Sequence, residues 1–181
     1  MHEHLSLDRP SRWVERFAAL VRPGAHALDL ACGGGRHTRL LAARGARVTA
    51  IDRDPAAIAG LDGRPDIRAL RADVECGPWP FANERFDALV VTNYLHRPLF
   101  PDLRDCLNPK GVLIYETFMV GNERFGRPSN PDFLLRPGEL IELCTGMWIV
   151  AFEQGEIDEI KPAMVQRICA IRPPTAGVRI P

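Results

Sequence analysis

Short apolar runs alternate with amphipathic stretches along most of the chain. Runs that are apolar nearly throughout predict strands at 25–31, 47–51, 67–71, 86–92 and 111–117. Amphipathic stretches predict helices at 36–44, 55–60 and 99–107, and an earlier helix, capped by Ser11, that runs to about Val21. Strands without a polar face, separated by helices, are typical of a parallel sheet covered on both sides. The pattern therefore predicts an α/β fold.

The alternation changes after the last of these strands. Residues 119–140 are rich in Gly, Pro, Asn and charged residues, which predicts a long loop. Its apolar residues favour an ordered lid, and a solvated loop packed by its phenylalanines is the alternative. A short helix is expected at 137–144. Strands at 147–153 and 164–172 follow, and the segment between them is too short for a helical crossover, so they should be antiparallel.

A chain of 181 residues fits one ordinary domain, and we expect a single domain over 1–181. Its predicted parts are an N-terminal helix at 9–22, a core at 25–118, the loop at 119–140, a terminal helix and hairpin at 141–172, and a peripheral tail at 173–181.

Composition excludes few functions. Apolar residues make up 46% and charged residues 25% of the chain, as in soluble globular proteins. The formal net charge of zero removes the broad attraction that drives nonspecific nucleic-acid binding. No apolar stretch approaches the roughly 20 residues of a membrane span, and the first residues lack a signal-peptide core, so the cytoplasm is the expected location.

The cysteines and histidines show no metal-ligand spacing, and no metal site is predicted. No C-x-x-C pair occurs. We interpret each cysteine as a reduced, small apolar core residue. These are Cys32, Cys76, Cys106, Cys144 and Cys169.

A glycine-rich turn stands between the first predicted strand and the following helix, in LDLACGGGRHTRLLAARG at 28–45. Such a turn brings backbone N–H groups and the positive end of a helix to a ligand, which favours something nucleotide-like. A phosphate-binding P-loop is excluded because its lysine and spacing are missing. A dinucleotide fingerprint is weakened because Thr38 stands at the third glycine position. A ligand without phosphates, S-adenosylmethionine, needs no third glycine.

Acidic residues end three predicted strands. Asp29 suits the ammonium group of S-adenosylmethionine. Asp52, about 20 residues after the turn, is placed to accept the two ribose hydroxyls. Asp73 is placed to accept a hydrogen bond from the adenine amino group. Three such acids are far more specific than one glycine turn.

Five segments together resemble a known family. ALDLACGGGRHTRLLAARG, VTAIDRD, ADVECGPWPF, FDALVVTNYLHR and LNPKGVLIYETF resemble successive motifs of the class I S-adenosylmethionine-dependent methyltransferases. The turn is most similar to small bacterial methyltransferases related to tellurite-resistance proteins. Two positions depart from the family pattern: Ala31 replaces the first glycine of the turn, and Lys110 precedes Gly111 where a double glycine is usual. Alanine fits there if its φ is negative.

The resemblance implies a single doubly wound, Rossmann-like sheet of seven strands, mostly parallel with an antiparallel last strand. It implies S-adenosylmethionine as the cofactor and assigns residues to its parts. The methionine end would contact Asp29, Ala31, Cys32, Gly33 and Gly35, the ribose Asp52 and Arg53, the adenine Asp73 and Val74, and the methyl group would face Asn93.

Methyl transfer from a sulfonium requires positioning of the acceptor and, for a hydroxyl or ammonium acceptor, a base. His96 is the first candidate base, and Tyr94 and Glu116 follow. A structural histidine and a buried or salt-bridged acid are the alternatives for His96 and Glu116. Trp13 covers the cofactor or belongs to the core.

The acceptor is expected to be a small molecule, because the run NYLH at 93–96 lacks the N/D-P-P-Y/F motif of enzymes that methylate nucleic-acid or protein amides. We expect neither a nucleic acid nor a membrane as partner. Arg124 and Arg127 are candidate contacts to an anionic acceptor. Open alternatives are a cofactor-binding regulatory or partner-dependent subunit and, less favoured, an NAD-type oxidoreductase. The sequence does not indicate whether the protein is a monomer or a homodimer.

Overall fold

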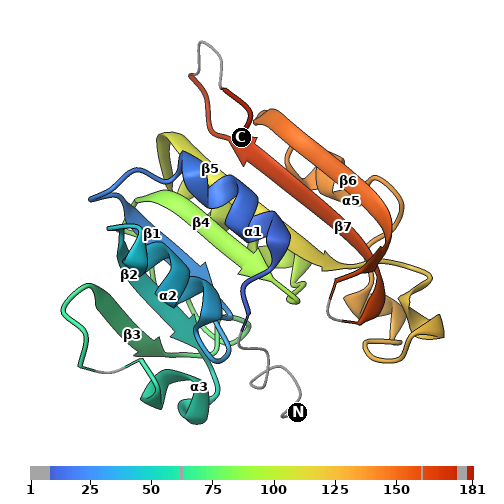
Figure 1. Cartoon of the computed structure of the whole chain (residues 1–181), viewed down its shortest axis with the longest axis horizontal. Coiled ribbons are helices and arrows are strands. Elements are labelled where there is room, and N and C mark those ends of the chain that lie inside the picture. The colour runs from blue at the N-terminus through green and yellow to red at the C-terminus, as the bar shows by residue number, and fades with distance from the viewer. Residues whose placement is uncertain (1–8, 62, 160, 175–178) are drawn as a thin grey trace.

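A computed structural model describes residues 9–61, 63–159, 161–174 and 179–181 of the chain. Its strands form one seven-stranded sheet in the order β3-β2-β1-β4-β5-β7-β6 (Figure 1). Strands β1 to β5 pair in parallel, and β7 is antiparallel to both β5 and β6. The predicted α/β sheet with a reversed last strand is confirmed. The strands are β1 (His26–Leu30), β2 (Arg47–Asp52), β3 (Ile67–Arg71), β4 (Phe86–Thr92), β5 (Leu107–Phe118), β6 (Trp148–Asp158) and β7 (Pro162–Ile171).

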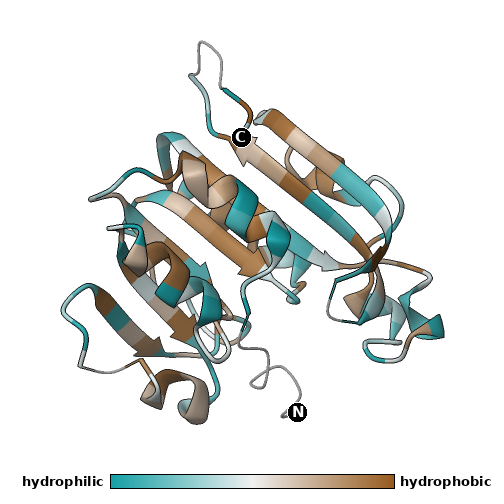
Figure 2. Ribbon diagram, in the orientation of Figure 1, coloured by the Kyte–Doolittle hydropathy of each residue, from teal (hydrophilic) through white to brown (hydrophobic). Residues whose placement is uncertain are grey.

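Helices cover both faces of the sheet. The helices are α1 (Arg12–Phe17), α2 (Arg36–Ala43), α3 (Pro55–Ala59), α4 (Phe100–Asp105) and α5 (Glu139–Leu143). Apolar side chains of α1, α2 and α3 pack with one face of the strands, and those of α4 and α5 pack with the other. The central strands are therefore buried on both sides, and they are largely brown in the hydropathy view (Figure 2). This burial explains why their sequences are apolar without alternation.

The N-terminal helix begins where the sequence indicates. The Ser11 hydroxyl accepts hydrogen bonds from the N–H groups of Trp13 and Val14, as an N-cap does. The α-helix ends at Phe17, and a 3₁₀ turn over Ala18–Leu20 completes the predicted span. Trp13 is 2% exposed and belongs to the core, where its indole N–H donates to the Ile168 carbonyl oxygen at 3.3 Å.

The terminal hairpin is longer than predicted. Strand β6 continues to Asp158 instead of 153, and β7 starts at Pro162 instead of 164. Backbone pairing extends to the Asp158 and Pro162 pair. The outer half of β6 is a sheet edge with exposed polar residues, so it carries no apolar signal that marks a strand.

Four of the five free cysteines are buried as interpreted, but Cys76 is exposed on the loop after β3. That part of the interpretation is wrong, because Cys76 lies on a surface loop and not in a strand or helix. No helix in the described part of the chain is long and apolar enough to span a bilayer.

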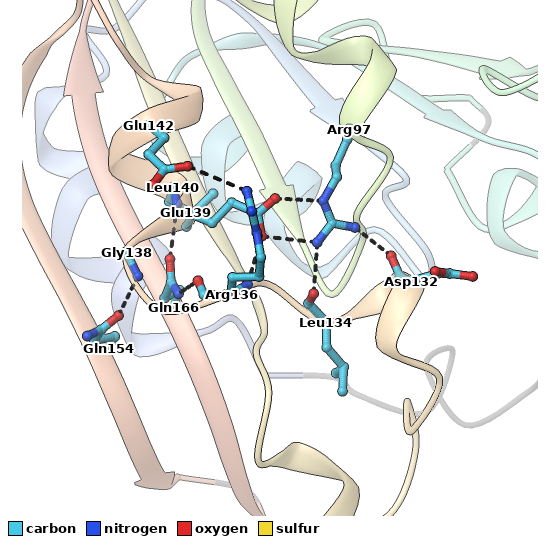
Figure 3. A network of polar contacts seen from close by, with 10 residues as sticks. All are labelled: Arg97, Asp132, Leu134, Arg136, Gly138, Glu139, Leu140, Glu142, Gln154 and Gln166. Carbon is cyan, nitrogen blue, oxygen red and sulfur yellow. Dashed lines mark hydrogen bonds and ion pairs between the residues drawn. The ribbon is translucent and has the colours of Figure 1, made fainter.

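The loop after β5 is anchored at one end by Arg97, which lies just beyond β4 (Figure 3). Its guanidinium donates to both carboxylate oxygens of Glu139, at 2.6 and 3.0 Å. It also donates to the carbonyl oxygens of Asp132 and Leu134, at 2.7 and 2.8 Å. One arginine thus ties three points of the segment 132–139 to the end of β4. Such a bidentate pair fixes geometry as well as charge.

Glu139 is almost fully enclosed, with 2% of the residue exposed. Burial alone would raise the pKa of its carboxyl. The hydrogen bonds from Arg97 and from the Arg136 N–H outweigh burial and hold the pKa at about 2. The carboxylate is therefore charged and fully paired at neutral pH.

We expect Arg97→Met to lower the free energy of unfolding by about 3 kcal/mol, because it leaves the Glu139 carboxylate buried without its main partner. Arg136→Met is the matched control. Arg136 also reaches Glu139, at 3.5 Å, but its side chain is 70% exposed, and we expect a loss below about 1 kcal/mol. Urea unfolding measures both. Equal losses in the two variants would contradict the anchoring role of Arg97.

Candidate functional site

Four polar residues lie at or just beyond the carboxyl ends of four adjacent strands. Asp29 is in β1, Asp52 ends β2, Asp73 follows β3 and Asn93 follows β4. These strands are neighbours in the order β3-β2-β1-β4 and run in parallel, so their carboxyl ends share one edge of the sheet. The sheet order therefore brings the sequence-predicted residues together.

The glycine turn joins β1 to α2 through three left-handed residues. Ala31, Gly33 and Gly35 have φ of 52°, 52° and 74°. The expectation of a negative φ at Ala31 is wrong. The left-handed conformation lets the chain turn back so that Cys32 N–H donates to the Ile51 carbonyl oxygen at 3.0 Å. A non-glycine residue in this conformation costs about 1–2 kcal/mol.

The end of the turn also leaves no room for a side chain at Gly35. A Cβ on Gly35 would lie 2.4 Å from a methyl carbon of Leu61. Cys32 is buried, and burial raises the pKa of its thiol, so it contributes backbone and packing to the turn.

Asp52 ties the turn to the neighbouring strand. One carboxylate oxygen accepts the Gly33 N–H at 2.9 Å, and the other accepts the Asp54 N–H at 2.9 Å. Each carboxylate oxygen can accept a second hydrogen bond. Asp52 can thus hold the turn and still accept hydroxyl groups of a ligand.

Asp29 is 1% exposed, and its carboxylate accepts the Thr38 hydroxyl at 2.5 Å. Burial raises the pKa of Asp29 to about 6, although Thr38 and the nearby Arg36 charge lower it. The residue at the missing third glycine position is therefore the hydrogen-bond donor that accommodates the buried acid.

The open side of the site lies at the end of β3. Arg53 and Asp73 form an exposed ion pair of 3.9 Å, and the Asp73 carboxylate also accepts the Glu75 N–H at 3.0 Å. Val74 packs against the core below them. The end of β3 therefore presents the charged groups of Arg53 and Asp73 next to the apolar side chain of Val74.

The loops after β3 and β4 meet at Glu75. The Nδ1 atom of His96 lies 4.0 Å from a carboxylate oxygen of Glu75. The Tyr94 hydroxyl is buried without a hydrogen-bond partner among the described residues, and burial, then the Glu75 charge, raise its pKa. Asn93 has a φ of 55°, and its N–H donates to the Glu116 carbonyl oxygen at 2.9 Å. Sequence reasoning missed Glu75, although it lies two residues after Asp73.

Glu116 lies near the end of β5, on the face covered by α1. It is 6% exposed, and Arg167 of β7 lies 3.2 Å from its carboxylate. Burial raises the pKa of Glu116, and Ser11 and Arg167 act against that rise. This arrangement is the salt-bridged alternative.

His37 of α2 was also missed, and it is 1% exposed. Its Nε2 atom accepts the Ser11 N–H at 3.0 Å, so the proton resides on Nδ1, which lies 3.3 Å from the Thr92 hydroxyl oxygen. The histidine links the start of α1 to α2 and β4. Only the fold reveals this role, because the three elements are far apart in sequence.

The two loop arginines are exposed. The Arg124 guanidinium lies over the Phe125 ring and 3.8 Å from Glu156, and Arg127 is on the surface of the same loop. A hollow of about 330 Å³ is lined by residues such as Arg104 and Arg172. It lies near the amino ends of the parallel strands, away from the carboxyl ends described above.

The chain is similar to known methyltransferases. Residues 27–111 match the methyltransferase domain family. Trans-aconitate 2-methyltransferase of Escherichia coli is 35% identical over 119 residues, which are 62% of this chain and 47% of that protein. The protein of that name from Shigella dysenteriae is 34% identical over 164 residues, 87% of this chain and 58% of that protein. The chain thus spans about half the length of the curated relatives it matches.

Solved structures share the fold. TehB from Haemophilus influenzae superposes with a TM-score of 0.73 at 20% identity, covering 88% of this chain and 61% of that one. The N-methyltransferase NodS from Bradyrhizobium japonicum, in complex with S-adenosyl-L-homocysteine, superposes with a TM-score of 0.68 at 21% identity, covering 94% and 95%. The domain match and the fold confirm the resemblance inferred from the sequence.

Burial makes His37 a source of acid sensitivity. Desolvation, then the Arg36 charge, lower its folded pKa from 6.5 to about 3. The unfolded chain therefore binds a proton below pH 6.5 that the folded chain does not, and stability falls as the pH falls. We expect this group to remove about 2 kcal/mol between about pH 7 and pH 5.

His37→Gln removes the titrating group, so the variant should lose about 2 kcal/mol less than the wild type over that interval. Asp29 titrates in both proteins and cancels from the difference. Chemical unfolding at the two pH values measures the slopes. Parallel slopes would show that His37 is not held neutral.

Proposed function

We propose, from the methyltransferase domain at 27–111 and the class I methyltransferase fold around it, that the chain transfers a methyl group from S-adenosylmethionine to a small-molecule acceptor. The observation that carries the proposal is the row of acids at adjacent strand ends with a left-handed turn bonded to the middle one, Asp52.

The residues present fit the cofactor. Asp52 keeps acceptor capacity for ribose hydroxyls after bonding the turn. Asp73 is exposed beside Val74, which suits a flat base with a polar amino group. Gly33 and Gly35 have no side chains, so a ligand can approach the backbone at the start of α2. Asp29 supplies a buried carboxylate for the methionine end. Ala31, Cys32, Arg53 and Asn93 complete the proposed cofactor residues. None of these positions demands a phosphate.

The bound cofactor would supply an electrophilic methyl group and a good leaving group. The protein's part is then to position the acceptor, exclude water and accept a proton where the acceptor carries one. Tyr94 offers a buried hydroxyl with no hydrogen-bond partner among the described residues, which suits a polar contact to a ligand.

His96 is the proposed base. Its Nδ1 atom lies 4.0 Å from the Glu75 carboxylate, and closure of this gap to a hydrogen bond would place a proton on Nδ1 and leave Nε2 as the accepting atom. Glu116, committed to Arg167, holds the Asn93 side of the site in position.

The acceptor class follows from the relatives and from the walls of the site. Trans-aconitate, which the relatives' name gives as their acceptor, carries several carboxylates, and Arg124 and Arg127 on the loop after β5 provide exposed positive charge. We propose a carboxylate-bearing small molecule, with this loop as a wall of its site.

Cofactor binding tests the proposal first. We expect S-adenosylhomocysteine to bind with micromolar affinity by calorimetry and Asp52→Ala to weaken it at least about 10-fold, since it loses charged hydrogen bonds. Asp66→Ala, which removes a partly buried acid paired with Arg64 before β3, is the control and should bind as the wild type does. Thermal protection by NAD and not by S-adenosylhomocysteine would instead favour an oxidoreductase.

Turnover tests the acceptor and the base. Production of S-adenosylhomocysteine should rise with trans-aconitate or another polycarboxylic acid, and if the acceptor atom must lose a proton, His96→Asn should lower kcat by about 100-fold or more. His26→Gln is the control, because His26 lies at the other end of β1 and bonds Thr49. No turnover by the isolated protein with any acceptor would favour a partner-dependent subunit.

A further inference from the structure

Arg36 is a half-buried cation at the start of α2. It is the first residue of α2 and directly follows the left-handed Gly35 of the turn. One guanidinium nitrogen donates to the Arg9 carbonyl oxygen at 3.2 Å. Among the described residues this is its one hydrogen bond, and no carboxylate of those residues comes within ion-pair distance. Most of the five N–H donors of this guanidinium therefore have no partner among the described residues.

Arg36 lies at the predicted methionine end, because it directly follows Gly35 and stands two residues before Thr38, whose hydroxyl bonds Asp29. Burial lowers its pKa, and the nearby carboxylates of Glu116 and Asp29 oppose that effect. Both acids are committed elsewhere, Glu116 to Arg167 and Asp29 to the Thr38 hydroxyl. The positive charge is thus close to two acids but paired with neither.

The amino-acid end of the cofactor is a zwitterion, with an ammonium and a carboxylate on the same carbon. Asp29 accounts for one sign, and no residue has yet been assigned to the other. Arg36 lies near enough to Asp29 for the two charges to interact, so the pair offers opposite charges at one end of the turn. The planar fork of a guanidinium matches a carboxylate, and the positive end of α2 adds to the attraction.

We propose that Arg36 binds the carboxylate of the cofactor's amino-acid end, opposite the ammonium that Asp29 attracts. The inference rests on the proposed function and deepens it by assigning a residue to one ligand group. The segment before α1 takes part, since the Arg9 carbonyl oxygen orients the guanidinium.

Two ligands separate this role from a structural one. S-adenosylhomocysteine carries the amino-acid group, whereas 5′-methylthioadenosine keeps the adenosine and sulfur but lacks it. Calorimetry gives the affinity of the wild type and of Arg36→Gln for each ligand, and the effect of the substitution is compared between the two ligands. We expect Arg36→Gln to weaken S-adenosylhomocysteine roughly 10- to 100-fold and to change 5′-methylthioadenosine affinity less than about 2-fold.

Arg39→Gln is the matched control, because Arg39 is an exposed arginine of the same helix, three residues further along. It should bind both ligands as the wild type does. Arg36→Lys, which keeps the charge and loses the fork, should fall between the wild type and Arg36→Gln.

Three results would overturn the inference. Equal weakening of both ligands would make Arg36 a structural residue. Unchanged affinity for both, with a raised KM for the acceptor, would assign it to an anionic substrate instead. Failure of the wild type to bind either ligand would overturn the proposed function together with the inference, and it is distinguishable because it appears without any substitution.

Discussion

The hydrogen bond between the Asp52 carboxylate and the Gly33 N–H holds the glycine turn to the strand beside it. The turn lies between β1 and α2, so this bond and the contact of Cys32 with Ile51 set where α2 begins. The positions of Arg36, His37 and Thr38 follow from that start. An acid expected to bind a ligand thus also builds the site. Its loss would remove the proposed ligand contact and release the turn from β2, and the left-handed Ala31 gives the turn a tendency to relax.

Two of the buried acids, Glu116 and Glu139, are paired with arginines. Arg97 pairs with Glu139, and Arg167 pairs with Glu116. Arg167 also lies 2.8 Å from Glu153 and 2.9 Å from Glu159. Such pairs contribute less to stability than their contacts suggest, since both partners lose water. Their effect is to fix positions. Arg97, the residue next to His96, fixes the loop after β5, and Arg167 fixes the end of β5 beside Asn93. The segment 132–139 is therefore anchored, as the proposed wall of the acceptor site requires.

The parts of this site that follow local patterns were predictable. Apolar runs predicted β1 to β4 within one residue, whereas β5 begins at Leu107, four residues before its predicted start. The parallel order brought Asp29, Asp52 and Asp73 to one edge. The parts that depend on contacts between distant segments were not. Nothing near Arg97 in sequence indicates Glu139, and the link from Ser11 to His37 needs the folded chain. The φ of Ala31 was misjudged because alanine usually avoids that region, and here long-range backbone bonds override the preference. The outer half of β6 was missed because an exposed edge strand needs no apolar residues.

A structure of the protein with S-adenosylhomocysteine would show directly whether the strand ends hold the cofactor. We expect the ribose hydroxyls on Asp52, the adenine beside Asp73 and Val74, and the amino-acid group at the turn between Asp29 and Arg36. We also expect the sulfur to face Asn93 and the residues that follow it. A ligand bound elsewhere, as in the hollow lined by Arg104 and Arg172 near the amino ends of the parallel strands, would contradict this expectation.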